Sequence, residues 1–87
     1  GEIYESIYYG IPEKQRGLLK ALACEGKVDK IQSGAFIKKY NLPSASSVQS
    51  AAKRLLDNDL ITMENNGLYS ISDRFLGMWL RQRLGKG

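Results

Sequence analysis

The sequence predicts a mainly α-helical domain that contains one small β-hairpin. A short helix pattern over residues 34–40 is separated by residues 41–44, which include Pro43, from a longer helix pattern over residues 45–58. Two short apolar strands then flank a turn at residues 65–67, and an Asn-Gly pair between apolar runs is a strong hairpin signal. Two helices joined by a tight turn and followed by a hairpin form a winged helix-turn-helix. This fold presents one helix face and one hairpin tip to a partner.

The composition is that of one small folded domain. The chain has 87 residues, of which 43% are hydrophobic and 25% are charged, which is ordinary for a globular domain. We expect a single domain over residues 1–87, with flanking helices and with residues 1–11 and 85–87 at its periphery. The chain begins at Gly1 and ends in Gly-Lys-Gly, so we expect it to be a fragment of a longer protein.

Several functional classes are excluded by composition. The chain has no histidine and a single cysteine, which excludes the usual zinc sites and histidine-based nucleophilic catalysis. That cysteine, Cys24, lies beside Leu22 and Ala23, so we expect a buried or half-buried thiol in a reducing compartment. No apolar run approaches the roughly 20 residues of a membrane-spanning helix. No catalytic constellation is evident either, and we expect a non-enzymatic cytoplasmic domain without a metal or other cofactor of its own.

The first part of the chain predicts two helices. Apolar residues at helical spacing predict a short amphipathic helix over residues 2–9: Ile3, Tyr4, Ile7 and Tyr8. After Gly10, Pro12 occupies a position where the first residue of a helix tolerates a missing N–H. The helix that it begins is expected to reach about Glu25, with Gly26 as its C-terminal stop. Residues 28–31 are expected to be extended.

Capping residues delimit the two helices of the helix-turn-helix. Ser33 is expected to cap the helix over residues 34–40, Asn41 to adopt a left-handed conformation, and Pro43 to prevent continuation. Ser44 is expected to cap the second helix. The apolar positions of the second helix follow the i, i+3, i+4, i+7, i+8 rule: Val48, Ala51, Ala52, Leu55 and Leu56.

The rest of the chain predicts two strands and a last helix. Residues 60–63 and 68–71 have the composition of the two strands of the hairpin. Ser72 or Asp73 is expected to cap a helix over residues 74–84. Arg81 and Arg83 in its last turn suit the negative end of the helix dipole.

The outward face of the helix over residues 45–58 is the candidate binding surface. It carries small hydroxyls, one glutamine and two cations, with no acid before Asp57. Serine and glutamine can bond base edges or phosphates in the major groove, and lysine and arginine can neutralise phosphates. The net charge of +4 and the pI near 9.3 also favour an acidic partner. We therefore predict a DNA-binding site made of Ser44, Ser46, Ser47, Gln49, Ser50, Lys53 and Arg54, with Lys38 and Lys39 near the same DNA backbone. The alternative is a capped helix start with a small solvated face.

Two other segments favour a protein partner. The expected hairpin tip, residues 64–66, lacks the arginine or lysine that a DNA-reading wing usually carries, so a plain tight turn is the simpler interpretation. The last helix is apolar around most of its circumference, through Phe75, Leu76, Met78, Trp79, Leu80 and Leu84. A helix of that kind must be covered on several sides. Core packing accounts for most of these residues, and any surplus would form an interaction surface, predicted at Tyr4, Tyr8, Met78, Trp79 and Leu80.

Several motifs resemble those of a known family. They include Pro-Glu-Lys-Gln-Arg at residues 12–16, Leu-Pro-Ser-Ala-Ser-Ser-Val at residues 42–48, and Asp-Arg-Phe-Leu at residues 73–76 with Trp-Leu-Arg at 79–81. Together they resemble the C-terminal winged-helix domain of a family of prokaryotic AAA-type ATPases, often called archaeal-type ATPases. The resemblance covers nearly the whole chain, from about Tyr4 to Arg83.

This resemblance implies a parent protein whose N-terminal P-loop module binds ATP and Mg, with this domain as its tail. In such proteins the tail is thought to bind DNA or to pack on the nucleotide module. None of the family's ATP-binding residues can be carried over, because this chain has no phosphate-binding motif. The leading hypothesis is a tail that binds duplex DNA. The alternative is a protein-interaction domain that docks on its own ATPase module or on a second protomer.

Overall fold

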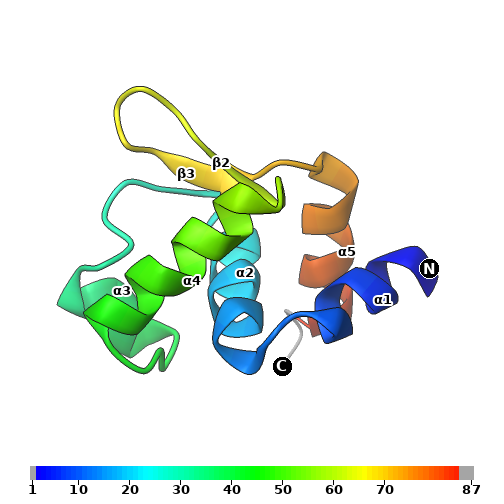
Figure 1. Ribbon diagram of the computed structural model, residues 1–87, viewed down its shortest axis with the longest axis horizontal. Helices are drawn as coiled ribbons and strands as arrows, with labels where there is room; N and C mark the ends of the chain where they lie inside the picture. The colour runs from blue at the N-terminus through cyan, green and yellow to red at the C-terminus, as the bar shows by residue number, and fades with distance from the viewer. Residues whose placement is uncertain (1, 85–87) are drawn as a thin grey trace.

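The computed structural model of this protein describes residues 2–84 (Figure 1). The elements follow the order α1 (Glu2–Gly10), α2 (Glu13–Glu25), β1 (Lys27–Val28), α3 (Gly34–Lys39), α4 (Ala45–Asp57), β2 (Ile61–Met63), β3 (Tyr69–Ile71) and α5 (Arg74–Leu84). The predicted fold class, mainly α with a small β-hairpin, is confirmed. The predictions for residues 85–87 and for the side chain of Leu84 fall outside the described part.

Helix α2 is the centre of the fold. It packs against α4 and against α5, which lie on opposite sides of it in Figure 1. Its side chains Leu18, Leu19 and Leu22 are fully buried, and burying each leucine contributes about 1.5–3 kcal/mol. Pro12 precedes the first turn as the N-cap, and Gly26 ends the helix at φ 91°. The layers of the molecule are therefore organised around one amphipathic helix with its apolar side buried.

Local hydrogen bonds explain where α3 and α4 begin. The Ser33 hydroxyl accepts a hydrogen bond from the Phe36 N–H at 3.2 Å, and the Ser44 hydroxyl accepts one from the Ser47 N–H at 3.1 Å. Each bond satisfies a donor that a helix start would otherwise leave unpaired. Between the helices, Asn41 has φ 54°, in the left-handed region that asparagine tolerates. The predicted caps and the predicted turn conformation are confirmed.

The sheet has one strand more than the sequence predicted. The order is β1-β3-β2, with both pairings antiparallel. β1 is only two residues long, and it begins at Lys27, which pairs with Ser70. The expected extended segment over residues 28–31 is a strand only at Val28. A pairing between residues so far apart in the chain leaves no local pattern in the sequence.

The hairpin turn uses glycine at one position. The Gly67 N–H bonds the Glu64 carbonyl at 2.8 Å, and the Glu64 N–H bonds the Leu68 carbonyl at 2.9 Å. In the described part of the chain, positive φ occurs in this turn at Gly67 alone, where it is 80°. A two-residue Asn-Gly turn would require positive φ at Asn66 as well. The connection is therefore a three-residue loop that ends in a left-handed glycine.

Within residues 2–84, the core joins all five helices to the base of the hairpin. Helix α4 buries the predicted residues Val48, Ala51, Ala52 and Leu55, while Leu56 is half-buried. The other elements add Tyr8 of α1, Phe36 of α3, Ile61 of β2, and Leu76 and Leu80 of α5.

The prediction of a buried or half-buried thiol at Cys24 is wrong, because Cys24 is exposed. Ala21, Leu22 and Ala23 are buried, whereas Lys20 is exposed. Cys24 follows Lys20 by four residues, and residues four apart lie on the same side of a helix. Cys24 therefore belongs to the solvent side of α2.

Candidate functional site

Five exposed side chains gather on one face of α4: Ser46, Gln49, Ser50, Lys53 and Arg54. We call this set the outer face of α4. Ser44 and Ser47, also predicted to belong to the site, are half-buried, since their atoms form the helix cap. Neither Lys53 nor Arg54 takes part in the ion pairs found within residues 2–84. Both cations are thus available to an anionic partner.

Two grooves flank the outer face. A groove of about 540 Å³ separates it from the start of α2, with Lys14, Gln15 and Arg54 among its lining residues. A second groove, of about 440 Å³, lies between α4 and β3 and is lined by Gln49, Lys53 and Tyr69, among others. Ser46 and Ser50 line both grooves, so they form the ridge between them. Lys14 and Gln15 were not predicted at this site, because only the packing of α2 on α4 brings them there.

A second glutamine supports the outer face. Gln32, in the loop between β1 and α3, donates from Nε2 to Oε1 of Gln49 at 3.2 Å. The same nitrogen donates to the carbonyl of Ala45 at 3.4 Å. Gln32 was not identified from the sequence, which has no local signal for a contact across 17 residues.

Lys39, which the sequence places near the same DNA backbone, forms an ion pair with a residue outside α4. Its Nζ lies 2.7 Å from the Glu25 carboxylate, to which the Tyr40 hydroxyl also donates. The hydrogen bond from Lys39, and then the one from Tyr40, hold the pKa of Glu25 below its usual value. The groove that Lys39 helps to line contains residues of α2, β1 and α3 and none of α4. Lys38 is exposed on the same short helix.

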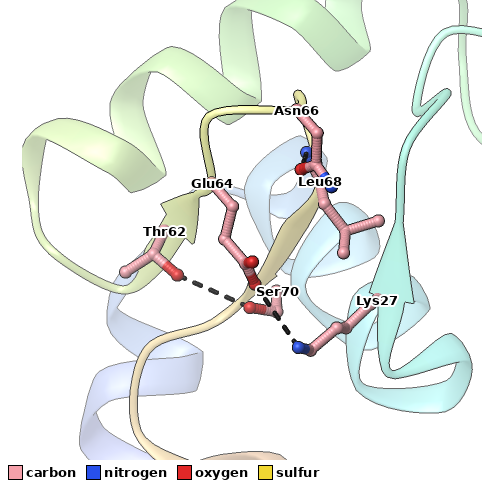
Figure 2. Close-up of polar contacts among 6 residues, drawn as sticks. All are labelled: Lys27, Thr62, Glu64, Asn66, Leu68 and Ser70. Carbon is pink, nitrogen blue, oxygen red and sulfur yellow. Dashed lines mark hydrogen bonds and ion pairs between the residues drawn. The ribbon is translucent and has the colours of Figure 1, made fainter.

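The wing, which we define as β2, β3 and the loop between them, has a polar face with one ion pair. Figure 2 shows Lys27 reaching across the sheet toward Glu64, and Thr62 toward Ser70. The Lys27 Nζ lies 3.3 Å from the Glu64 carboxylate, and the two hydroxyls are 3.5 Å apart. At the tip, the Asn66 side chain accepts a hydrogen bond from the Leu68 N–H. The wing has no lysine or arginine of its own, and its acid is paired with Lys27.

The predicted interaction surface is partly used inside the domain. Tyr8 is 8% exposed and Leu80 1%, so both are core residues here. The centroid of the Trp79 ring lies 6.1 Å from the ring centroid of Tyr4 and 6.2 Å from that of Tyr8. Trp79 and Tyr4 are half-buried. These contacts attach α1 to α5.

More exposed apolar side chains lie elsewhere on the same two helices. Met78 of the predicted set is 38% exposed, while Phe75 is 64%, Ile3 75% and Tyr9 60% exposed. The apolar pattern of α5 did not indicate which of its residues the rest of the domain would leave uncovered.

Residues 2–84 contain no group of three or more His, Cys, Asp or Glu side chains arranged to hold a metal ion. Over the same residues, no helix has the length and apolar character needed to cross a membrane.

Comparison with known proteins gave one match. A family model described as "Probable winged helix domain" matches residues 2–82. No curated protein matches the chain significantly, and no solved structure does. The matched segment includes α1 and most of α5, so the family model extends beyond the helix-turn-helix and the wing.

Proposed function

The chain belongs to the winged helix family whose model matches residues 2–82, and on this premise we propose that it binds duplex DNA through the outer face of α4. Domains of this family are binding modules for nucleic acids or proteins. The observation that carries the choice of DNA is the pair of exposed cations, Lys53 and Arg54, beside hydroxyl and amide groups on one helix face. Neither cation forms an ion pair within residues 2–84, although Asp57 lines the same groove as Lys53.

The geometry supports a division of roles on α4. The major groove of B-DNA admits one α-helix, whose N-terminal residues contact base edges. Ser46, Gln49 and Ser50 lie in the first two turns of α4 and would meet the bases. Lys53 and Arg54 lie one turn further along and would contact phosphates, a role that Lys14 and Lys38 could share.

The wing contributes little to this binding mode. A wing that enters the minor groove usually carries a basic side chain, and this one carries none. Because Glu64 is paired with Lys27, its charge repels phosphates less than a free carboxylate would. We propose that the wing holds the C-terminal end of α4, against which β2 packs, in position and contacts no bases.

Salt dependence tests the proposal. Binding of a short fluorescent duplex is expected to be measurable at low salt and to weaken as salt rises. The slope of log K against log salt should be about −2 or steeper, since each phosphate contact contributes about −0.9. Fluorescence anisotropy measures both quantities. Absence of binding at the lowest salt would contradict the proposal.

We also propose that this domain is the C-terminal tail of a prokaryotic AAA-type ATPase in the cytoplasm. The motifs at residues 12–16, 42–48 and 73–81 support this proposal by resemblance. ATP and Mg would then be bound by a separate module. Reading the gene upstream of Gly1 tests the idea, because a phosphate-binding loop of the form G-x-x-x-x-G-K-[ST] should be encoded there.

Protein docking through α1 and α5 is the second candidate function. The exposed side chains of Phe75 and Met78 favour it, since uncovered apolar area often marks a contact surface. If this surface pairs two protomers, Phe75→Ser should convert a dimer into a monomer in light scattering, while Ser6→Ala on exposed α1 surface should not. Trp79→Ala is a poorer test, because Trp79 also holds α1 through Tyr4 and Tyr8. A wild-type chain that stays monomeric at high concentration would contradict self-association.

A further inference from the structure

We infer that Gln49 recognises an adenine in the major groove and that Gln32 holds Gln49 in the orientation which that recognition requires. The inference rests on the proposed DNA binding and specifies which base that binding selects. An amide network lies at the beginning of α4, where Nε2 of Gln32 donates to both Oε1 of Gln49 and the carbonyl of Ala45.

The backbone carbonyl determines the orientation of both amides. A carbonyl oxygen only accepts hydrogen bonds, so the Gln32 atom beside Ala45 must be the nitrogen. The same nitrogen also donates to the Gln49 side chain. Because a donor must meet an acceptor, the Gln49 atom in that contact must be Oε1. The Nε2 group of Gln49 is thus at the free end of the amide. It has no hydrogen-bond acceptor within residues 2–84.

This orientation matches the edge of adenine. Gln49 offers two N–H donors at Nε2 and one unused lone pair at Oε1. Adenine offers an acceptor at N7 beside a donor at N6, and glutamine pairs with both. Guanine offers two acceptors, N7 and O6, so Oε1 would face O6 without a proton between them. A free glutamine can turn its amide away from such a contact, whereas Gln49 would lose the bond from Gln32 by turning.

The location of Gln49 suits this role. It is exposed and lies in the second turn of α4, within the part of a recognition helix that contacts base edges. It lines the groove of about 440 Å³ together with Lys53, four residues further along the helix. When Gln49 contacts a base, a phosphate close to that base would therefore lie within reach of the Lys53 side chain. Gln32 acts through Gln49 and is a positioning residue.

Selection from a pool of randomised duplexes tests the inference. Sequencing of the fraction retained by the wild-type domain should show adenine enriched at one position. Gln49→Ala should abolish the enrichment, a loss of about tenfold on the scale of one bidentate base contact, and Gln32→Ala should reduce the enrichment by a smaller factor. Gln32→Lys keeps the N–H donors and should restore the preference. Gln82→Ala, at an exposed glutamine of α5, is the matched control and should retain it.

A modified base identifies the atom involved. At the enriched position, 7-deazaadenine lacks the N7 acceptor and should weaken wild-type binding by about tenfold, with no further loss in Gln49→Ala. A pool that is not retained at low salt would overturn DNA binding and this assignment together. Retention without an adenine preference, or a preference that survives Gln49→Ala, would overturn the assignment alone. A preference unchanged in Gln32→Ala would remove the positioning role.

Discussion

Replacing Leu22 with alanine is expected to lower the free energy of unfolding by about 2–5 kcal/mol. The side chain is fully buried in the helix that packs against both α4 and α5, so the cavity would loosen both sides of the core. Domains of this kind are stable by only about 5–15 kcal/mol. Urea unfolding followed by circular dichroism should show a lower midpoint with an unchanged slope.

Lys20→Ala is the matched control for Leu22→Ala. Lys20 lies two residues earlier on the same helix and is exposed, so its replacement should change the free energy of unfolding by no more than about 0.5 kcal/mol. Equal effects of the two substitutions would mean that α2 is not the central helix of the core.

The double charge reversal Lys53→Glu/Arg54→Glu is expected to weaken duplex binding at low salt by at least about tenfold. Each lost phosphate contact makes the slope of log K against log salt shallower by about one unit, so loss of both contacts should make it shallower by about two. Neither side chain has an ion-pair partner to lose within the described chain. The new carboxylates would lie at the negative end of α4 and close to Asp57, so the free energy of unfolding should fall by about 1 kcal/mol, which leaves the domain folded. Anisotropy titrations at several salt concentrations measure the change.

Lys20→Glu/Arg74→Glu provides the control for net charge. Both positions are exposed, and Arg74 lines a groove formed by α2, the sheet and α5 without any residue of α4. The two double variants carry the same net charge. If both lose affinity to the same extent, binding depends on total charge alone, and the assignment to the outer face of α4 is wrong.

The elements of the fold were predictable because their boundaries depend on neighbouring residues. Ser33 and Ser44 cap the helices that follow them by bonding an N–H three residues on. Asn41 and Gly67 supply the left-handed conformations that the two tight turns require. Each of these signals acts within a few residues, so the sequence alone contains it.

What the sequence did not reveal depends on contacts between distant segments. β1 is a strand only because β3 pairs with it, and a two-residue strand has no periodicity. The exposure of Cys24 is a different case, since the position of Lys20 one turn earlier could have indicated it. The neighbours Leu22 and Ala23 misled the prediction because adjacent residues of a helix point in different directions.

The candidate site, like the fold, was predictable where it depends on one helix and not where it depends on contacts between separate elements. A helix with one apolar stripe must expose the opposite side, so the outer face of α4 follows from Val48, Ala51 and Leu55. The pairing of Lys39 with Glu25 and the link from Gln32 to Gln49 do not follow, since both join separate elements. The first pairs one predicted site cation with an acid, and the second is the contact on which the proposed base preference depends.

An NMR titration of the isotope-labelled domain with a short duplex tests most directly whether DNA binds the outer face of α4. The quantity measured is the change in chemical shift of each backbone amide. We expect the largest shifts at Ser46, Gln49, Ser50, Lys53 and Arg54, with little change at Phe75 and Met78 on the other side of α2. Shifts concentrated on α5, or no shifts at low salt, would contradict DNA binding through the outer face of α4.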